Sequence, residues 1–265
     1  TRLSRGLGDV YKRQDLLDSG GLVQGRVNED WGFAAAGRRS YIDAVLGIDG
    51  LLPNPDLVVR PRWYDYQLKL DRLDTDRDRL SVFVFGFRDD LLVSTGSGFA
   101  QGTDADTQGD IGTTYSTHRG YVLWEHPFNN EWLLRFTPSI GIDGALFTLG
   151  NDTQVEQWQL LAEVRSELLY TPSEALTVTS GVDFIGGNYW FTFELPINPE
   201  EFADYDPLGE REPFAIDGRG LGWGPDLYLK ADWRPLSDPD RLLITPGIRA
   251  NFVTITDSEN PETLF

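Results

Sequence analysis

The chain has 265 residues, no cysteine and a formal net charge of −19. The lack of cysteine excludes disulfides and thiolate metal sites, and the acidic balance excludes a nucleic-acid-binding surface, which needs a clustered positive field. No stretch of the sequence approaches the ~18 consecutive apolar residues of a membrane helix, but the strands of a transmembrane barrel need only about ten alternating residues.

The first residues resemble a sequence from outside the native gene. The segment DVYKRQ (Asp9 to Gln14) resembles the in-frame translation of GAT GTG TAT AAG AGA CAG, the transposase mosaic end used in sequencing libraries. Processing scars must be set aside before a fold is inferred, so we expect residues 1–14 to be non-native. The chain contains no methionine and stops after the loop-like TDSENPETLF. We therefore expect residues 15–265 to be a piece of a longer protein.

From residue 63 onward, apolar and polar residues alternate with the period of two of a half-buried strand. In WYDYQLKLD (63–71), tyrosine and leucine share one face, and charged and amide side chains share the other. The same alternation recurs in WLLRFTPSIGID (132–143), LTVTSGVDF (176–184), DLYLKADW (226–233) and LLITPGIRANF (242–252). Each of these segments is predicted to be a strand with one apolar and one polar face.

Two segments are less regular. SVFVFGF (81–87) is apolar on both faces. VEQWQLLAEVRSELLY (155–170) alternates like a strand, yet it also fits a helix through Trp158, Leu161, Val164 and Leu168. Because its neighbours are strands, we predict a strand there.

The connections also follow a pattern. Short polar turns fall at NEDW, DTDRD, NNEW, PSEA and SDPD. Between them lie longer connections around GIDGLLPNPDLVVRP, GSGFAQGTDADTQGDIGTTYST, GNDTQ and INPEEFADYDPLGEREPFAIDGRG. This arrangement predicts about ten strands in five hairpins, with the tight turns at one end and the long loops at the other.

The fold class follows from strand length and from aromatic placement. Soluble β-sandwiches and propellers have strands of about five or six residues, whereas segments such as DRLSVFVFGFRDDLLV are much longer. Aromatics lie near strand ends at Trp31, Trp132, Tyr170 and Trp233. The pattern predicts an all-β fold, a partial antiparallel transmembrane β-barrel, with a soluble sandwich or propeller as the alternative.

The stretches WGFAAAGRRSYIDAVL and PRWYDYQLKLDRLDTDRDRLSVFVFGFRDD resemble the start of the barrel in the TonB-dependent receptor family. In that comparison, residues 36–41 follow the first periplasmic turn and residues 64–67 follow the first outer loop. The resemblance extends from Asp15 to Phe265 and is most specific over the first third.

The resemblance implies a barrel of about 22 strands in the outer membrane of a Gram-negative bacterium, plugged by an N-terminal domain. Such a receptor takes up a scarce ligand, such as a ferric siderophore, cobalamin or a glycan. The implied partners are the TonB complex, reached through the missing N-terminal region, outer-membrane lipid and lipopolysaccharide, and a small-molecule or metal-chelate ligand. Because the chain lacks the plug and half of the strands, we expect no transport by the fragment alone. A passive porin is the alternative within membranes.

We expect no enzyme and no cofactor, since the sequence has neither a nucleophile elbow nor a phosphate-binding loop. If the apolar faces meet lipid, a set of polar side chains points into the lumen. We expect these residues to pair with one another and to contact the plug: Arg38, Asp65, Lys69, Arg135, Asp143, Glu163, Arg165, Asp183, Lys230 and Arg249.

Two weaker sites are also predicted. Aromatics of the long loops, Phe202, Tyr205, Phe214 and Trp223, are candidates for stacking on an organic chelate. DADTQGDIGTTY fits a calcium loop only in part: Asp104, Asp106 and Asp110 are candidate ligands, but the twelfth position is tyrosine instead of glutamate. An acidic loop without an ion is the alternative. His118 and His126 lie at opposite ends of one predicted strand, so no shared metal site is expected.

Overall fold

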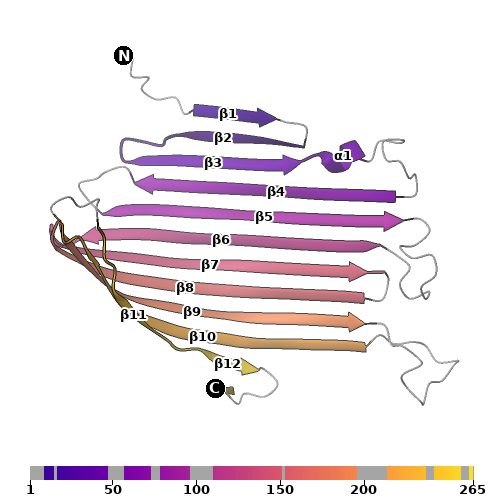
Figure 1. The fold of residues 1–265 in the computed structure, drawn as a ribbon. Coiled ribbons are helices and arrows are strands. Elements are labelled where there is room, and N and C mark those ends of the chain that lie inside the picture. Colours follow the sequence, from indigo (N-terminus) through magenta and orange to yellow (C-terminus); the bar gives the residue numbers. More distant parts are fainter. Residues whose placement is uncertain are drawn as a thin grey trace.

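The computed structural model describes residues 9–14, 17–46, 57–72, 78–95, 110–150, 153–195, 214–236, 242–257 and 263–264. These residues form a single antiparallel 13-stranded sheet and one short helix, α1 (Ile42–Leu46) (Figure 1). The strands are β1 (Asp9–Gln14), β2 (Asp18–Arg26), β3 (Trp31–Ser40), β4 (Leu57–Arg72), β5 (Arg79–Thr95), β6 (Ile111–Pro127), β7 (Trp132–Leu149), β8 (Thr153–Ser173), β9 (Leu176–Leu195), β10 (Phe214–Trp233), β11 (Gly247–Asn251), β12 (Thr254–Asp257) and β13 (Thr263–Leu264).

Strand order follows chain order. Each strand from β1 to β10 pairs with its successor, and β11 and β12 both pair with β10. β11 and β12 keep one register along β10 and are interrupted at Phe252 and Val253, opposite Pro225 and Gly224. Within the described residues the order is a linear path with β1 and β13 at its ends, so the sheet is open.

β2 pairs with β3, β4 with β5, β6 with β7, β8 with β9 and β10 with β11, each antiparallel, so the pairing of the five predicted hairpins is confirmed. The predicted turns DTDRD and SDPD lie almost wholly outside the described residues. Two of the turns are stabilised in the same way, by an asparagine side chain. The side-chain oxygen of Asn28 accepts hydrogen bonds from the backbone of Asp30 and Trp31, and Asn129 does the same for Glu131 and Trp132. An asparagine that bonds its own backbone two and three residues on fixes a tight turn.

One predicted long connection is wrong. β7 ends at Leu149 and β8 begins at Thr153, so the connection near GNDTQ spans only residues 150–152. Gly150 adopts a positive φ of 65°, which only glycine takes at little cost, and its amide donates to the carbonyl of Asp110. The glycine therefore permits the tight reversal at the loop end of the sheet.

The ambiguous segment 155–170 is a strand. It lies within β8, paired on both sides along nearly its whole length, with β7 and with β9. The helix α1, which the sequence pattern did not predict, follows β3, and the backbone amides of Ala44 and Val45 donate to the carbonyl of Tyr41. In the described part of the chain, no helix is long and apolar enough to cross a membrane.

The sheet has no hydrophobic core of its own. Among the described residues no apolar side chain is buried, and large apolar side chains such as Ile140 (58% exposed) and Ile248 (74%) are open. A soluble sandwich buries the inner faces of two packed sheets. A single-layer sheet with exposed apolar side chains instead needs an apolar surrounding.

The suspected scar forms the edge of this sheet. All six residues of β1 pair with β2, from Asp9 opposite Gln24 to Gln14 opposite Ser19. An exposed edge accepts extended segments through backbone hydrogen bonds alone, so pairing does not depend on whether the segment is native. The non-native origin of residues 1–14 stays a prediction.

Candidate functional site

The register divides the side chains of the sheet into two faces, because residues directly opposite each other in a ladder point to the same side. One row across β3 to β8 runs Arg38, Asp65, Phe87, Thr117, Asp143 and Gln159. The face to which this row belongs, here called the polar face, carries all ten residues predicted for the lumen: Arg38, Asp65, Lys69, Arg135, Asp143, Glu163, Arg165, Asp183, Lys230 and Arg249.

A chain of charged and polar contacts crosses the polar face, starting on β5. Arg79 lies 3.3 Å from Glu125, and the same carboxylate binds Arg135 at 2.8 Å. Arg135 also reaches Glu167 at 3.1 Å. The hydroxyl of Tyr228 donates to Glu167 at 2.7 Å. Side chains from β5, β6, β7, β8 and β10 are thereby connected.

The contacts continue to the far edge of the sheet. The guanidinium of Arg249 on β11 lies 5.5 Å from the ring centroid of Tyr228 and binds Asp226 at 2.5 Å and Asp183 at 3.2 Å. Arg165 completes the set with two hydrogen bonds to Asp183. We call the whole set the charged ladder: Arg79, Glu125, Arg135, Glu167, Tyr228, Arg249, Asp226, Asp183 and Arg165.

A second polar cluster centres on Asp143. Its carboxylate accepts hydrogen bonds from the Thr117 hydroxyl, from Arg119 at 2.7 Å and from Gln159 at 3.0 Å. The other predicted lumen residues also have partners on the same face. Arg38 donates to Asp65 at 2.8 Å, Ser139 lies 3.5 Å from Glu163, Lys69 pairs with Asp71, and Lys230 pairs with Asp232. Within the predicted set, Arg38 pairs with Asp65, and Arg165 and Arg249 pair with Asp183. The other five have partners outside the set, and the orientation of all ten toward a lumen stays a prediction.

The polar face also carries an aromatic patch that the sequence pattern did not assign to a face. Phe83, Phe85 and Phe87 point to this side, and Phe83 packs on Tyr121 while Phe87 packs on Tyr115. SVFVFGF is apolar on both sides because β5 contributes valine to one face and phenylalanine to the other. The aromatic patch cannot be recognised from β5 alone, because the tyrosines that pack on its phenylalanines come from β6.

The opposite face, here called the apolar face, contains Tyr66, Leu68, Phe136, Ile140, Leu227 and Leu229, the residues that the alternating pattern assigns to one side of the strands. Leu68, Leu227 and Leu229 are each about half exposed. An exposed surface of this kind favours an apolar surrounding, because the described residues provide no second layer over it.

Two belts of aromatic residues border the apolar face. Tyr64, Trp158 and Trp190 lie in one row toward the loop end. Toward the turn end, Trp132 stacks on Tyr170 with ring centroids 4.4 Å apart. Trp233 lies on the same face, two residues along β10 from the row that contains this pair. Along β8 the distance from Tyr170 to Trp158 is about 40 Å at ~3.3 Å per residue, or ~28 Å across a membrane for a 45° tilt. This matches the height of a lipid-facing band.

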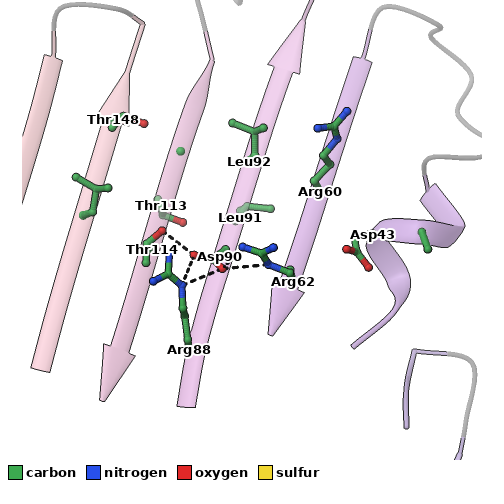
Figure 2. A pocket seen from close by; sticks show the side chains of 13 residues that line it. Asp43, Arg60, Arg62, Arg88, Asp90, Leu91, Leu92, Thr113, Thr114 and Thr148 are labelled. Carbon is green, nitrogen blue, oxygen red and sulfur yellow. Dashed lines mark hydrogen bonds and ion pairs between the residues drawn. The ribbon is translucent and has the colours of Figure 1, made fainter. Parts of the chain in front are cut away.

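A pocket of about 610 Å³ opens on the apolar face beyond the row that contains Tyr64, close to α1 (Figure 2). Arg60, Arg62, Arg88 and Asp90 line it. Asp90 accepts hydrogen bonds from Arg62 at 2.9 Å, from Arg88 at 2.9 Å and from Thr114 at 2.8 Å. The sequence pattern did not single out these arginines, because they are spread over β4 and β5 and only the register brings them together.

The two histidines are separately engaged. The Tyr66 hydroxyl and His118 Nδ1 lie 3.1 Å apart on the apolar face, and the rings stack. His126 Nδ1 donates to Asp78 at 2.7 Å, and Trp124 donates to the same carboxylate at 2.8 Å. The hydrogen bond from His126 lowers the pKa of Asp78, which lies outside the strands. The two histidines thus take part in different contacts.

The weaker predictions fall largely outside the described residues. This applies to Asp104, Asp106, Phe202 and Tyr205 and to the side chain of Phe214, whose backbone begins β10. Asp110 is described and exposed, and no cluster of three metal-ligating side chains occurs in the described part. The placement of Trp223 in a loop is wrong: it lies inside β10 on the apolar face and stacks on Phe184. The glycine-rich stretch GRGLGWG around Trp223 is typical of a loop, although it forms the middle of β10 here.

The sequence matches no protein-family model and no curated protein. Solved structures match in fold. FpvA of P. aeruginosa, in complex with iron and a heterologous pyoverdine, has a TM-score of 0.62 and 14% identity, over 97% of this chain and 38% of FpvA. BauA, the ferric preacinetobactin receptor of Acinetobacter baumannii, has a TM-score of 0.59 and 16% identity, over 95% of this chain and 41% of BauA.

The siderophore receptor PiuA of Acinetobacter baumannii matches with a TM-score of 0.55 and 9% identity, over 94% of this chain and 45% of PiuA. The chain thus spans less than half the length of these proteins. At such low identity the similarity concerns the fold alone. It confirms the predicted fold class, part of an antiparallel transmembrane β-barrel.

Proposed function

We propose that this chain is part of the barrel wall of a TonB-dependent receptor in a Gram-negative outer membrane. The observation that carries the proposal is the division of a single-layer sheet into a face crossed by the charged ladder and a face of exposed apolar side chains. A barrel in a bilayer accommodates both, with lipid outside and a polar lumen inside. Residues 15–265 are the proposed extent of the native wall.

The charged ladder is the proposed lumen surface. Its ion pairs are partly exposed in the open sheet; the Arg165 side chain, for example, is 55% exposed. A hollow of about 340 Å³ lies beside it, lined by residues that include Glu163, Arg165, Asp183 and Arg249. We assign this hollow to contact with a plug domain, which would supply further partners for these charges.

The proposed activity of the whole receptor is uptake of a scarce ligand, energised by the TonB complex. Among ferric siderophores, cobalamin and glycans, the first class is favoured because PiuA is described as a siderophore receptor and BauA as a ferric preacinetobactin receptor. Ligand contact is assigned to the long loops, including Phe202 and Tyr205. The proposed role is transport, with no catalytic step.

The test starts from the complete gene, recovered from the source DNA. It is expressed in a Gram-negative strain that lacks its own siderophore receptors, and uptake of a panel of siderophores loaded with radioactive iron is measured with and without TonB. The proposal predicts uptake of at least one ferric siderophore that disappears without TonB. Uptake that is independent of TonB would identify a passive porin, and a protein that stays in the aqueous phase on detergent partitioning would be a soluble module. Either result refutes the proposal.

A further inference from the structure

We propose that the barrel wall contains two seams at which it opens locally, one beside Pro138 and one beside Pro225, and that arginine bridges on the polar face keep both seams closed. The first seam is the boundary between β6 and β7, and the second is the boundary between β10 and the short strands β11 and β12. The inference goes beyond the proposed function and uses it only to place the seams in the bilayer.

Each seam is an interruption of the backbone pairing. Residues 122–123 of β6 and 137–138 of β7 are missing from the register that pairs these two strands. Residues 224–225 of β10 pair with β9, but in the described register they do not pair with residues 252–253. In both places the strand that carries the proline is unpaired on the seam side at the proline and at the residue just before it.

Proline accounts for this pattern. It has no backbone N–H, so the carbonyl opposite receives no hydrogen bond from it, and the next pair along the ladder, which shares that bond, is lost as well. The Pro225 carbonyl still accepts a hydrogen bond from the amide of Phe252 at 3.1 Å. The carbonyl of Phe252, by contrast, lies so close to Gly224 that a side chain on the glycine would collide with it. Each seam therefore lacks the bond that a proline cannot donate.

The position of these two prolines is unusual. In sheets, proline is confined to edge strands, strand starts and bulges. Pro61 follows this rule, because the register of β4 with β5 runs through it unbroken and the pairing of β4 with β3 has already ended. Pro138 and Pro225 instead lie inside strands that have partners on both sides. A local rule that is broken inside a regular element points to a place with a function.

The two seams lie at the same height. Pro138 lies opposite Val164 on β8, and Val164 lies opposite Phe184 on β9. Phe184 in turn lies opposite Pro225, and along β8 this row lies midway between the two aromatic belts. In the proposed barrel the missing bonds therefore fall near the centre of the bilayer, where lipid offers no replacement donor. The pairs from β7 to β10 are uninterrupted at this height, so local opening is confined to the seams.

Ion pairs on the polar face bridge both seams. Arg135 on β7 binds Glu125 on β6 at 2.8 Å. Arg249 on β11 binds Asp226 on β10 at 2.5 Å. A cross-strand ion pair adds attraction where the ladder lacks a hydrogen bond. A charged group that competes for these arginines therefore weakens the wall first at its seams.

The test is hydrogen exchange of the complete receptor in phospholipid vesicles, measured by mass spectrometry on peptides that cover the centres of β6 and β9. Arg135→Gln removes the bridge across the first seam, and we expect exchange at the centre of β6 to accelerate about fivefold, the factor given by one hydrogen bond of ordinary net strength. Arg165→Gln is the matched control, because it removes a two-point bridge to Asp183 across the uninterrupted pair of β8 and β9. We expect exchange at the centre of β9 to stay unchanged in this variant.

A second variant tests the seam without removing an ion pair. Pro138→Val supplies the missing N–H in a residue that suits a strand. Exchange at the centre of β6 should therefore slow by a similar factor, about fivefold.

Failure of the proposed function is measured separately, as water access at Ile140 or as missing uptake by the whole receptor, and neither enters this comparison of exchange rates. Unchanged exchange at the centre of β6 in Pro138→Val would overturn the inference. Equal acceleration by Arg135→Gln and Arg165→Gln, each at the strand pair that it bridges, would also overturn it, because the proline would then make no difference.

Discussion

Arg165 on β8 and Asp183 on β9 lie directly opposite each other and form a two-point ion pair, with hydrogen bonds of 2.7 and 3.1 Å. Asp183 also accepts from Arg249. One carboxylate thus joins three strands through two arginines, while the rest of the charged ladder continues to β5. The pairing of opposite charges across neighbouring strands contributes to register as well as to stability.

Replacing the shared carboxylate should destabilise the sheet more than replacing one arginine. Asp183→Asn leaves two guanidinium groups without their partner, and we expect a loss of about 1 kcal/mol of unfolding free energy, because exposed pairs contribute only ~0.2–1 kcal/mol each. Arg165→Gln should cost less. Urea unfolding in micelles measures both, with Glu174→Gln in an exposed turn as the control. A loss no larger for Asp183→Asn than for Glu174→Gln would contradict the role of the ladder.

Gly86 should not tolerate a side chain. It lies between Tyr66 and His118 on the apolar face, and a Cβ atom there would collide with both rings. Gly86→Ala should separate the Tyr66 hydroxyl from His118 and lower the unfolding free energy by about 1–3 kcal/mol. Gly37→Ala is the matched control, since it lies beside Tyr66 on the same face with its nearest atom at 3.8 Å. Equal losses in the two variants would refute the prediction.

Acid should weaken the contact between Asp78 and His126. The pKa of Asp78 is lowered in the folded chain by the hydrogen bond from His126. A carboxyl whose folded pKa is depressed adds stability above its unfolded pKa of about 3.9, and this stability is lost as the pH falls through the folded value. The indole N–H signal of Trp124, which donates to Asp78, should shift below about pH 4 and stay constant in Asp78→Asn. An identical titration in the variant would contradict the assignment.

Residues 1–14 should be dispensable. β1 pairs with β2 alone, at the edge of the sheet. A chain that begins at Asp15 should lose only the β content of β1 and keep its melting temperature, whereas a chain that begins at Val27 should lose stability because it also lacks β2. We expect a long sequencing read of the source DNA to agree with the codons of this chain from Asp15 onward and to differ from them upstream of Asp15. Codons for Asp9 to Gln14 continuous with the native frame would show that the segment is native.

Much of the fold follows from alternation along single strands. The period of two assigns Leu68, Ile140 and Leu227 to one face, and strand neighbours decide that residues 155–170 form β8 and not a helix. The sequence does not predict how short the connection after β7 is. The strands can approach so closely there because Gly150 adopts a positive φ, and the residue pattern alone does not show this. Helix α1 was missed because five residues give no helical period.

The candidate sites depend more on register than on local pattern. The ten residues predicted for the lumen share one face in the structure, and the sequence groups them because each alternates with apolar neighbours on its own strand. The partners of Arg165, by contrast, come from β9, and the arginine pocket joins Arg62 and Arg88 through Asp90. Such contacts arise between strands far apart in the sequence, and no single-strand pattern contains them.

The most direct test of the two-faced wall uses neighbouring residues on β7, Ser139 on the polar face and Ile140 on the apolar face. The chain has no cysteine, so Ser139→Cys and Ile140→Cys can each be introduced into this part of the complete receptor, since an open sheet edge is not tolerated in a bilayer. The variants are placed in phospholipid vesicles and treated with a water-soluble maleimide. We expect rapid labelling at position 139, and at position 140 protection together with quenching by brominated lipid of a fluorophore attached before reconstitution. Rapid labelling at position 140 without lipid quenching would contradict the lipid-facing assignment and, with it, the membrane barrel.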